Sequence, residues 1–179
     1  KKKNNHFFFK INDKIVGENV SSKINRLFNI LKKNKSDSIF ISAPENVAWL
    51  LNIRGKDNPN SPIPHSRIIL DKKKNIFLFT DLKKIKNIKN KIKYKKIKFF
   101  SFKKFYDILV KSNSSFFTID KLTCSVFFQG LIGSRYKINN YVDPIYYLKS
   151  IKNKIEIKNM INAHIIDGVA LTRFIYWIK

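Results

Sequence analysis

One stretch with little lysine, residues 42–66, most strongly constrains what this chain can fold into. Pro44 suits the first turn of a helix, where its missing N–H costs nothing. The residues that follow are apolar enough to press this helix into a core: Val47, Ala48, Leu50 and Leu51. Pro59, Pro62 and Pro64 then exclude a regular helix or a central strand, because proline donates no backbone hydrogen bond. We therefore expect a buried helix followed by a stiff, ordered loop, an element that can shape the edge of a site.

The junction between this helix and the loop holds the candidate site residues. Residues 52–57 should break the helix, with Gly55 free to take a positive φ. Arg54 and Asp57 lie in the loop, where they could touch a substrate or a neighbouring subunit. We favour a local ion pair that holds the loop in place over either contact.

Short apolar runs alternate with helical patterns along the rest of the chain. Strands are predicted at residues 38–42, 67–70, 76–80, 95–101, 116–119 and 135–141. Helices are predicted at residues 24–31 (capped by Ser21 or Ser22), 82–92 (capped by Asp81), 102–111, 123–132 and from Pro144, with Asp143 as its cap. The pattern indicates an α/β fold, a mixed β-sheet layered with helices, in which residues 67–80 form a hairpin.

Two segments carry a family resemblance. AWLLNIRGKDNPNSPI (residues 48–63) resembles a segment in the middle domain of three-domain Xaa-Pro aminopeptidases. Asp143-Pro144 followed by YLKSIKNKIEIKNMINAHIIDGVALTRFIYWI (residues 147–178) is similar to a second segment of the same family, and the two cover about a third of the chain. The sequence departs from the family pattern at Lys56, Ser61 and Pro64, where serine, asparagine and an aromatic residue are usual.

The resemblance implies a domain layout. Residues 21–152 would form the creatinase/prolidase N-terminal-like domain, and residues 1–20 an interdomain connection. Residues 6–16, rich in phenylalanine and isoleucine, could form an extended arm on a neighbour or a loosely ordered tail. Residues 153–179 would be one long helix that begins the catalytic pita-bread domain. We therefore expect this chain to be a piece of a longer metalloaminopeptidase, which removes the N-terminal residue preceding proline.

The same resemblance implies the cofactors and partners. The family uses two divalent metal ions, usually manganese, held by two Asp, one His and two Glu of the catalytic domain, so we expect no catalytic and no metal-binding residue in this chain. The implied partners are peptides with proline in the second position, the protein's own catalytic domain and a second copy in a homodimer. A single cysteine, Cys124, fits a reducing, cytoplasmic compartment, and no apolar run reaches the length of about 20 residues that spans a membrane.

The charge balance is extreme. The chain has 37 Lys and Arg against 12 Asp and Glu, a formal net charge of +25. Such a charge fits a nucleic-acid-binding module, but it also fits A/T-rich codons, since Lys, Asn, Ile, Phe and Tyr are all heavily used. We favour codon bias and expect no specific nucleic-acid partner, because a dedicated surface would favour arginine. A creatinase or prolidase relative with another substrate is the other alternative function.

Four further residues could suggest chemistry. His164 has a metal-ligand interpretation, but a single histidine at helical spacing is more often structural, and we expect it to be so. Cys124 should be a small buried residue and not a nucleophile, since no histidine is near it in the sequence. Trp49 and Trp177 lie among apolar neighbours and are predicted to be core residues.

Overall fold

A mixed sheet of six strands, in the order β6-β5-β4-β2-β7-β8, forms the centre of the fold. In this computed structural model residues 6–179 are described. The strands are β2 (Ser38–Ile41), β4 (Ser66–Asp71), β5 (Ile76–Thr80), β6 (Ile97–Phe100), β7 (Phe116–Ile119) and β8 (Lys137–Asn140). The β2–β4 and β4–β5 pairs are antiparallel and the other three pairs are parallel, which confirms the predicted mixed sheet.

The hairpin of β4 and β5 has the register that its apolar pattern requires, with Ile68 opposite Leu78. The Asp71 carboxylate closes the turn by accepting from the backbone N–H of Lys73 at 2.8 Å and of Asn75 at 2.9 Å. Lys74 takes a φ of 62° in that turn. A local side-chain acceptor therefore fixes the turn, as is usual for aspartate.

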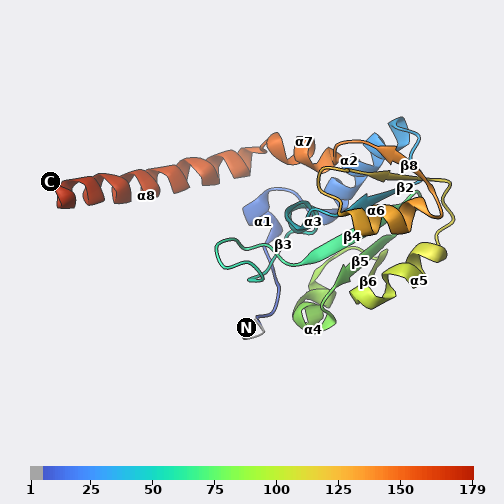
Figure 1. Ribbon diagram of the computed structural model, residues 1–179. Coiled ribbons are helices and arrows are strands. Elements are labelled where there is room, and N and C mark those ends of the chain that lie inside the picture. The colour runs from blue at the N-terminus through green and yellow to red at the C-terminus, as the bar shows by residue number, and fades with distance from the viewer. Residues whose placement is uncertain (1–5) are drawn as a thin grey trace.

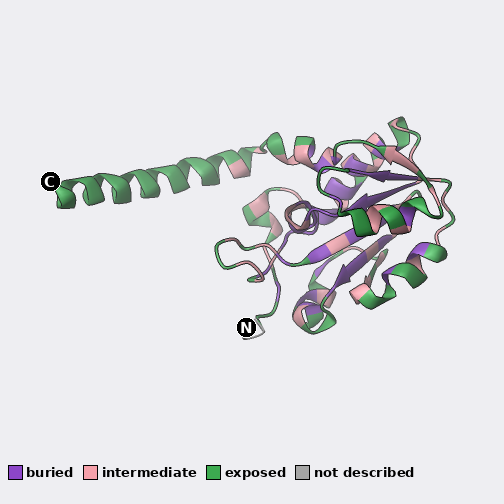
Figure 2. Cartoon of the chain, in the orientation of Figure 1, coloured by how far each residue is buried: buried purple, intermediate pink, exposed green. Residues whose placement is uncertain are grey.

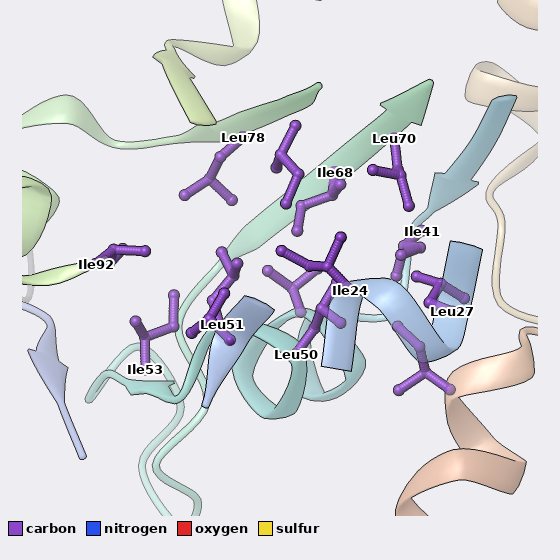
Figure 3. Close-up of a cluster of buried hydrophobic side chains, with 14 of the residues drawn as sticks. Ile24, Leu27, Ile41, Leu50, Leu51, Ile53, Ile68, Leu70, Leu78 and Ile92 are labelled. Carbon is purple, nitrogen blue, oxygen red and sulfur yellow. The ribbon is translucent and has the colours of Figure 1, made fainter. Parts of the chain in front are cut away.

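One face of the sheet is covered by α2 (Val20–Lys33), α3 (Pro44–Leu51) and α7 (Pro144–Ser150). Because side chains alternate along a strand, every second residue of β2, β4 and β5 points to this face. We call it the aliphatic face, after the strand residues Ile39, Ile41, Ile68, Leu70, Ile76 and Leu78. Figure 3 shows Ile24, Leu50 and Leu51 of the helices packed against these strand residues.

The opposite face, here the aromatic face, carries Phe40, Ile69, Phe79, Phe117 and Ile119 from the strands. It is covered by the short 3₁₀-helix η2 (Phe102–Lys104), by α5 (Phe105–Val110) and by α6 (Val126–Gly133). The rings of Phe105 and Phe128 pack edge to face with centroids 4.7 Å apart, and Phe105 also lies 5.0 Å from Phe79. Ring–ring contacts therefore hold these helices on the sheet.

The N-terminal arm packs on the protein's own domain. Its strand β1 (Phe9–Lys10) pairs antiparallel with β3 (Ile53–Arg54), and Phe8 is 2% exposed among the aliphatic-face residues. The short helix α1 (Asp13–Val16) follows. The interdomain connection predicted at residues 1–20 stays a prediction, and its first five residues lie outside the described part.

The long helix α8 (Lys154–Ile178) leaves the domain after α7 and extends away from it, as Figure 1 shows. Figure 2 shows that it is exposed along its length. The predicted fold class, an α/β domain followed by one long C-terminal helix, is confirmed. Within residues 6–179, no helix combines the length and the hydropathy that crossing a bilayer requires.

Several predicted boundaries are wrong. Asn19 caps α2, because its side chain accepts from the backbone N–H of Ser22, and neither Ser21 nor Ser22 is the cap. The helix expected at residues 82–92 divides into α4 (Leu82–Ile85) and a 3₁₀-helix η1 (Lys86–Lys91). The helix expected from Thr123 begins at Val126, since the Asp120 carboxylate and carbonyl hold the preceding residues in a turn.

Candidate functional site

The loop between β3 and β4, residues 55–65, is the segment singled out by the sequence. It follows α3, whose first residue is Pro44 as predicted. The loop contains an isolated bridge between Asn58 and Ser61. In Figure 1 this loop and α8 extend from the domain toward the same side of the view. The loop therefore lies at an edge of the domain in this view.

Arg54 is turned toward the domain. Its Nη1 donates to the carbonyl oxygens of Ile53 at 2.8 Å and of Ala48 at 3.2 Å, and desolvation by burial lowers the pKa of its guanidinium. The Ala48 carbonyl also accepts from the backbone N–H of Asn52, and carbonyls near the end of a helix favour a nearby cation. Arg54 thus holds the end of α3 and makes no ion pair with Asp57 in the described structure.

Asp57 closes the base of the loop. Its carboxylate, whose side chain is 4% exposed, forms an ion pair with Lys84 of α4 and accepts from the backbone N–H of His65 at 2.7 Å. Asp57 thus pairs with Lys84, 27 positions away in the sequence, and not with Arg54 as in the local ion pair that we favoured. One carboxylate ties both ends of the loop to α4.

Two hollows flank the loop. One, of about 470 Å³, is lined by His6, Lys56 and residues 58–62. The other, of about 500 Å³, is lined by residues that include Asp57, His65, Lys83 and Lys103. Both offer hydroxyl and cationic groups. Among residues 6–179 there is no group of three or more His, Cys, Asp or Glu that could hold a metal ion.

Gly55 has a different role from the one predicted. Asn52, and not Gly55, takes the left-handed conformation after α3, with a φ of 53°. A Cβ on Gly55 would lie 2.9 Å from the Phe8 ring and 2.9 Å from Pro64 Cα. Glycine is thus needed where the arm and the loop come close together, and not for a turn.

Asn52 joins three segments, and sequence reasoning missed it. Its side-chain amide donates to the Glu18 carbonyl at 2.9 Å and to the Asp13 carboxylate at 3.2 Å. Its Oδ1 accepts from Lys23 Nζ at 2.7 Å, and its carbonyl accepts from the N–H of Ile11. An asparagine after the last apolar residue of a helix is a known C-terminal signal, and that signal could have found it.

Lys23 is buried beneath the same junction. It is 1% exposed, and its Nζ donates to Asn52 and to the Trp49 carbonyl at 2.9 Å while lying 4.1 Å from the Trp49 ring centroid. Desolvation lowers the pKa of this ammonium to about 8. The group is inaccessible, so it links α2 to the end of α3 and offers no reactive amine to solvent.

The root of α8 is fixed to α1. Asn153 caps α8 in a reciprocal capping box with Glu156, and its Nδ2 donates to the Val16 carbonyl at 2.8 Å. Asn159 adds a bond to the Ile15 carbonyl. Gly17, with a φ of 74°, leaves the space that the Asn153 side chain occupies. Polar contacts with α1 therefore set where α8 begins.

The other weighed residues lie apart from the loop. Cys124 is buried as predicted, and burial raises the pKa of its thiol to about 11. Trp49 packs against the aliphatic face, but Trp177 is 78% exposed on α8, so the prediction of a core position is wrong for Trp177. His164 is exposed on the same helix. No described contact joins either α8 residue to the loop.

Two known proteins are similar in sequence to this chain over most of its length. The chain is 31% identical over 180 residues to Xaa-Pro aminopeptidase 1 of Dictyostelium discoideum, covering 99% of this chain and 28% of that protein. It is 32% identical over 155 residues to Xaa-Pro aminopeptidase ApepP of Drosophila melanogaster, covering 83% and 25%. The chain thus spans little more than a quarter of the length of these relatives.

The fold comparison points the same way. The structure of an X-prolyl aminopeptidase from Caenorhabditis elegans, described as a cytosolic enzyme with a di-nuclear active site, superposes with a TM-score of 0.82. That match has 22% sequence identity and covers 97% of this chain and 29% of that one. The sequence pattern of the creatinase/prolidase N-terminal domain matches residues 1–156. This chain therefore belongs to the creatinase/prolidase N-terminal domain family.

Proposed function

We propose that this chain is the non-catalytic part of a metal-dependent Xaa-Pro aminopeptidase, an enzyme that removes the N-terminal residue preceding proline. In this proposal residues 21–152 are the second domain of the enzyme and residues 153–179 begin its catalytic domain. Over 99% and 83% of its length, this chain is 31% and 32% identical to the two named relatives. An activity on creatine-like or dipeptide substrates is the alternative within the same family.

The exposed apolar surface of α8 is the observation that carries the proposal. The helix is 25 residues long, about 37 Å at 1.5 Å per residue. Beyond its first turn its large apolar side chains are exposed: Met160, Ile161, Ile165, Ile166, Val169, Leu171, Phe174, Ile175, Trp177 and Ile178. A soluble domain rarely leaves so much apolar surface in water. The proposed catalytic domain would cover it.

The loop extends from the domain toward the same side of Figure 1 as α8. We propose that a body packed along α8 also meets the segment Asn58–Pro62. The Asp57–Lys84 pair holds that segment in place. We propose that the loop narrows the approach to the catalytic centre, so that chain ends and short peptides enter. In this proposal Asp57 positions the loop, and Arg54 holds the end of α3 that precedes it.

The residues of this chain do not fit a two-metal site, since the described part holds no cluster of suitable ligands. We therefore place the two divalent ions, manganese by family resemblance, in the catalytic domain and derive no step of the hydrolysis from this chain. A cytoplasmic location and a homodimer complete the proposal, and the similar nematode enzyme is described as cytosolic.

The test has two arms. The chain alone, incubated with manganese and a peptide that begins X-Pro, should show no turnover, and measurable turnover would contradict a non-catalytic role. The reading frame from which the chain derives should encode the two Asp, one His and two Glu ligands downstream of residue 179. Expression of that whole frame should give X-Pro cleavage of peptides longer than two residues. Activity on X-Pro dipeptides alone would favour the prolidase alternative.

A further inference from the structure

A cavity on the aromatic face lies apart from the loop and from α8. Its volume is about 350 Å³, within the range of small-molecule sites. It is lined by residues of β4, β5 and β6, by Ile108 of α5 and by residues 111–114 after that helix. The helix ends at Val110, and the chain then turns away toward β7. This part of the sheet is therefore left without a covering helix.

The floor of the cavity is apolar. Phe77 of β5 and Phe100 of β6 have ring centroids 6.3 Å apart and form the floor with Ile69 of β4, and Ile108 of α5 borders it. Phe77, Phe100 and Ile108 are only half-buried. A flat apolar group placed on these rings would remove their remaining surface from water, which is favourable at about 25 cal/mol per Å².

The rim of the cavity is cationic. Four lysines line it: Lys72, Lys73, Lys98 and Lys111. The one carboxylate in the lining, that of Asp71, is occupied by the backbone N–H groups of Lys73 and Asn75 and by the Asn75 side chain. The Lys72 ammonium lies 3.4 Å from Asp37, whereas no contact within residues 6–179 occupies the ammonium groups of Lys98 and Lys111. The rim thus has positive charge available.

We infer that this cavity binds a small anion with a flat aromatic body, the ring on Phe77 and Phe100 and the anionic group between Lys98 and Lys111. Such a site combines an apolar surface with a few charged groups that fix orientation. The inference is independent of the proposed peptidase role, because the cavity lies on the opposite face of the sheet from α2, α3 and α7.

Naphthyl phosphate and uncharged naphthol form a matched pair of probes for isothermal titration calorimetry with the whole chain. Naphthyl phosphate should bind saturably at one site, and naphthol about tenfold more weakly, because naphthol lacks the charge that the two exposed ammonium groups of Lys98 and Lys111 attract. Absence of saturable binding, or equal affinity for the two probes, would overturn the inference.

Two variants locate the site. Lys98→Glu with Lys111→Glu should weaken naphthyl phosphate binding at least about tenfold. The matched control, Lys83→Glu with Lys103→Glu, makes the same charge change beside the hollow of about 500 Å³ that flanks the loop. It should leave the affinity within about twofold. Equal weakening by both pairs would show general attraction to a basic protein and overturn a specific site.

A third variant tests the cavity itself. Asn113 is exposed at the rim, and Asn113→Trp should fill the mouth and abolish binding without a change of charge. Full affinity in that variant would place the ligand elsewhere. Circular dichroism and the urea midpoint of each variant establish that it is folded.

Discussion

On the aliphatic face of the sheet, α2, α3 and α7 bury nearly every apolar side chain, whereas on the aromatic face α5 and α6 leave several phenylalanine rings half-exposed. The two faces come from the same strands, so strand sequence alone does not explain the difference. The amount of helix on each face does, since the aliphatic face has three helices, one of them the 14-residue α2, and the aromatic face has α5 of six residues and α6 of eight. Complete covering gives stability, and incomplete covering leaves room for a ligand.

The largest expected effect comes from the fully covered face. Leu50 is completely buried between α3 and the sheet. Leu50→Ala should lower the free energy of unfolding by about 3–5 kcal/mol, because a packed site cannot collapse around the lost methyl groups. Urea denaturation measures it, with Leu122→Ala, at a leucine 90% exposed, as the control. A loss of below about 1 kcal/mol would mean that this face is loosely packed.

The next largest loss of stability is expected at the junction around Asn52. Asn52→Ala strains a residue with positive φ and leaves the Lys23 ammonium and the Glu18 carbonyl without that partner. A loss of about 2–3 kcal/mol is expected. Asn52→Gly keeps the backbone conformation and removes the amide, so the difference between the two variants isolates the strain. Two neutral variants would show that the junction does not contribute to stability.

On the partly covered face the same kind of truncation should cost less. Phe100 is half-buried and lies against Phe77 and Phe79. Phe100→Ala should lower the free energy of unfolding by about 1–2 kcal/mol, less than the 3–5 kcal/mol of a fully buried ring. A loss as large as that of Leu50→Ala, measured in the same urea series, would remove the distinction between the faces.

The smallest effect, taken over a single pH unit, is a pH dependence at Lys23. Its pKa falls from 10.5 in the unfolded chain to about 8 in the folded protein, so between these values the unfolded chain binds the extra proton. The free energy of unfolding should therefore rise with pH across this window, by at most about 1.4 kcal/mol per pH unit. The comparison is with Lys23→Met over pH 8 to 10. A difference in the free energy of unfolding that stays constant over this range would contradict the lowered pKa of Lys23.

Local rules predicted the parts of the fold that neighbouring residues decide. Pro44 starts α3, Asp143 caps α7, and β7 has the predicted bounds. The hairpin also follows, because Asp71 closes its turn from within the turn. In each case the deciding groups lie within a few positions of one another, which is the range over which a single sequence is informative.

The candidate site was less predictable because its contacts join distant segments. Asp57 finds Lys84 and Asn52 finds Lys23, pairs separated by 27 and 29 positions. The role of Gly55 depends on Phe8 approaching from the arm. For Trp177, periodicity showed an apolar surface but could not tell whether this chain or another body covers it.

The way α8 is rooted has a mechanical consequence. A helix of 25 residues that is held at one end acts as a lever, so a tilt of about 10° at Asn153 would move its tip by about 6 Å. Asn153 and Asn159 are hydrogen-bonded to α1, and Asp13 of α1 is hydrogen-bonded to Asn52. These bonds thus set the direction of α8 and the position of any body packed along it. A substitution as small as Gly17→Ala, which would displace the Asn153 side chain, could misalign a distant partner while leaving the sheet intact.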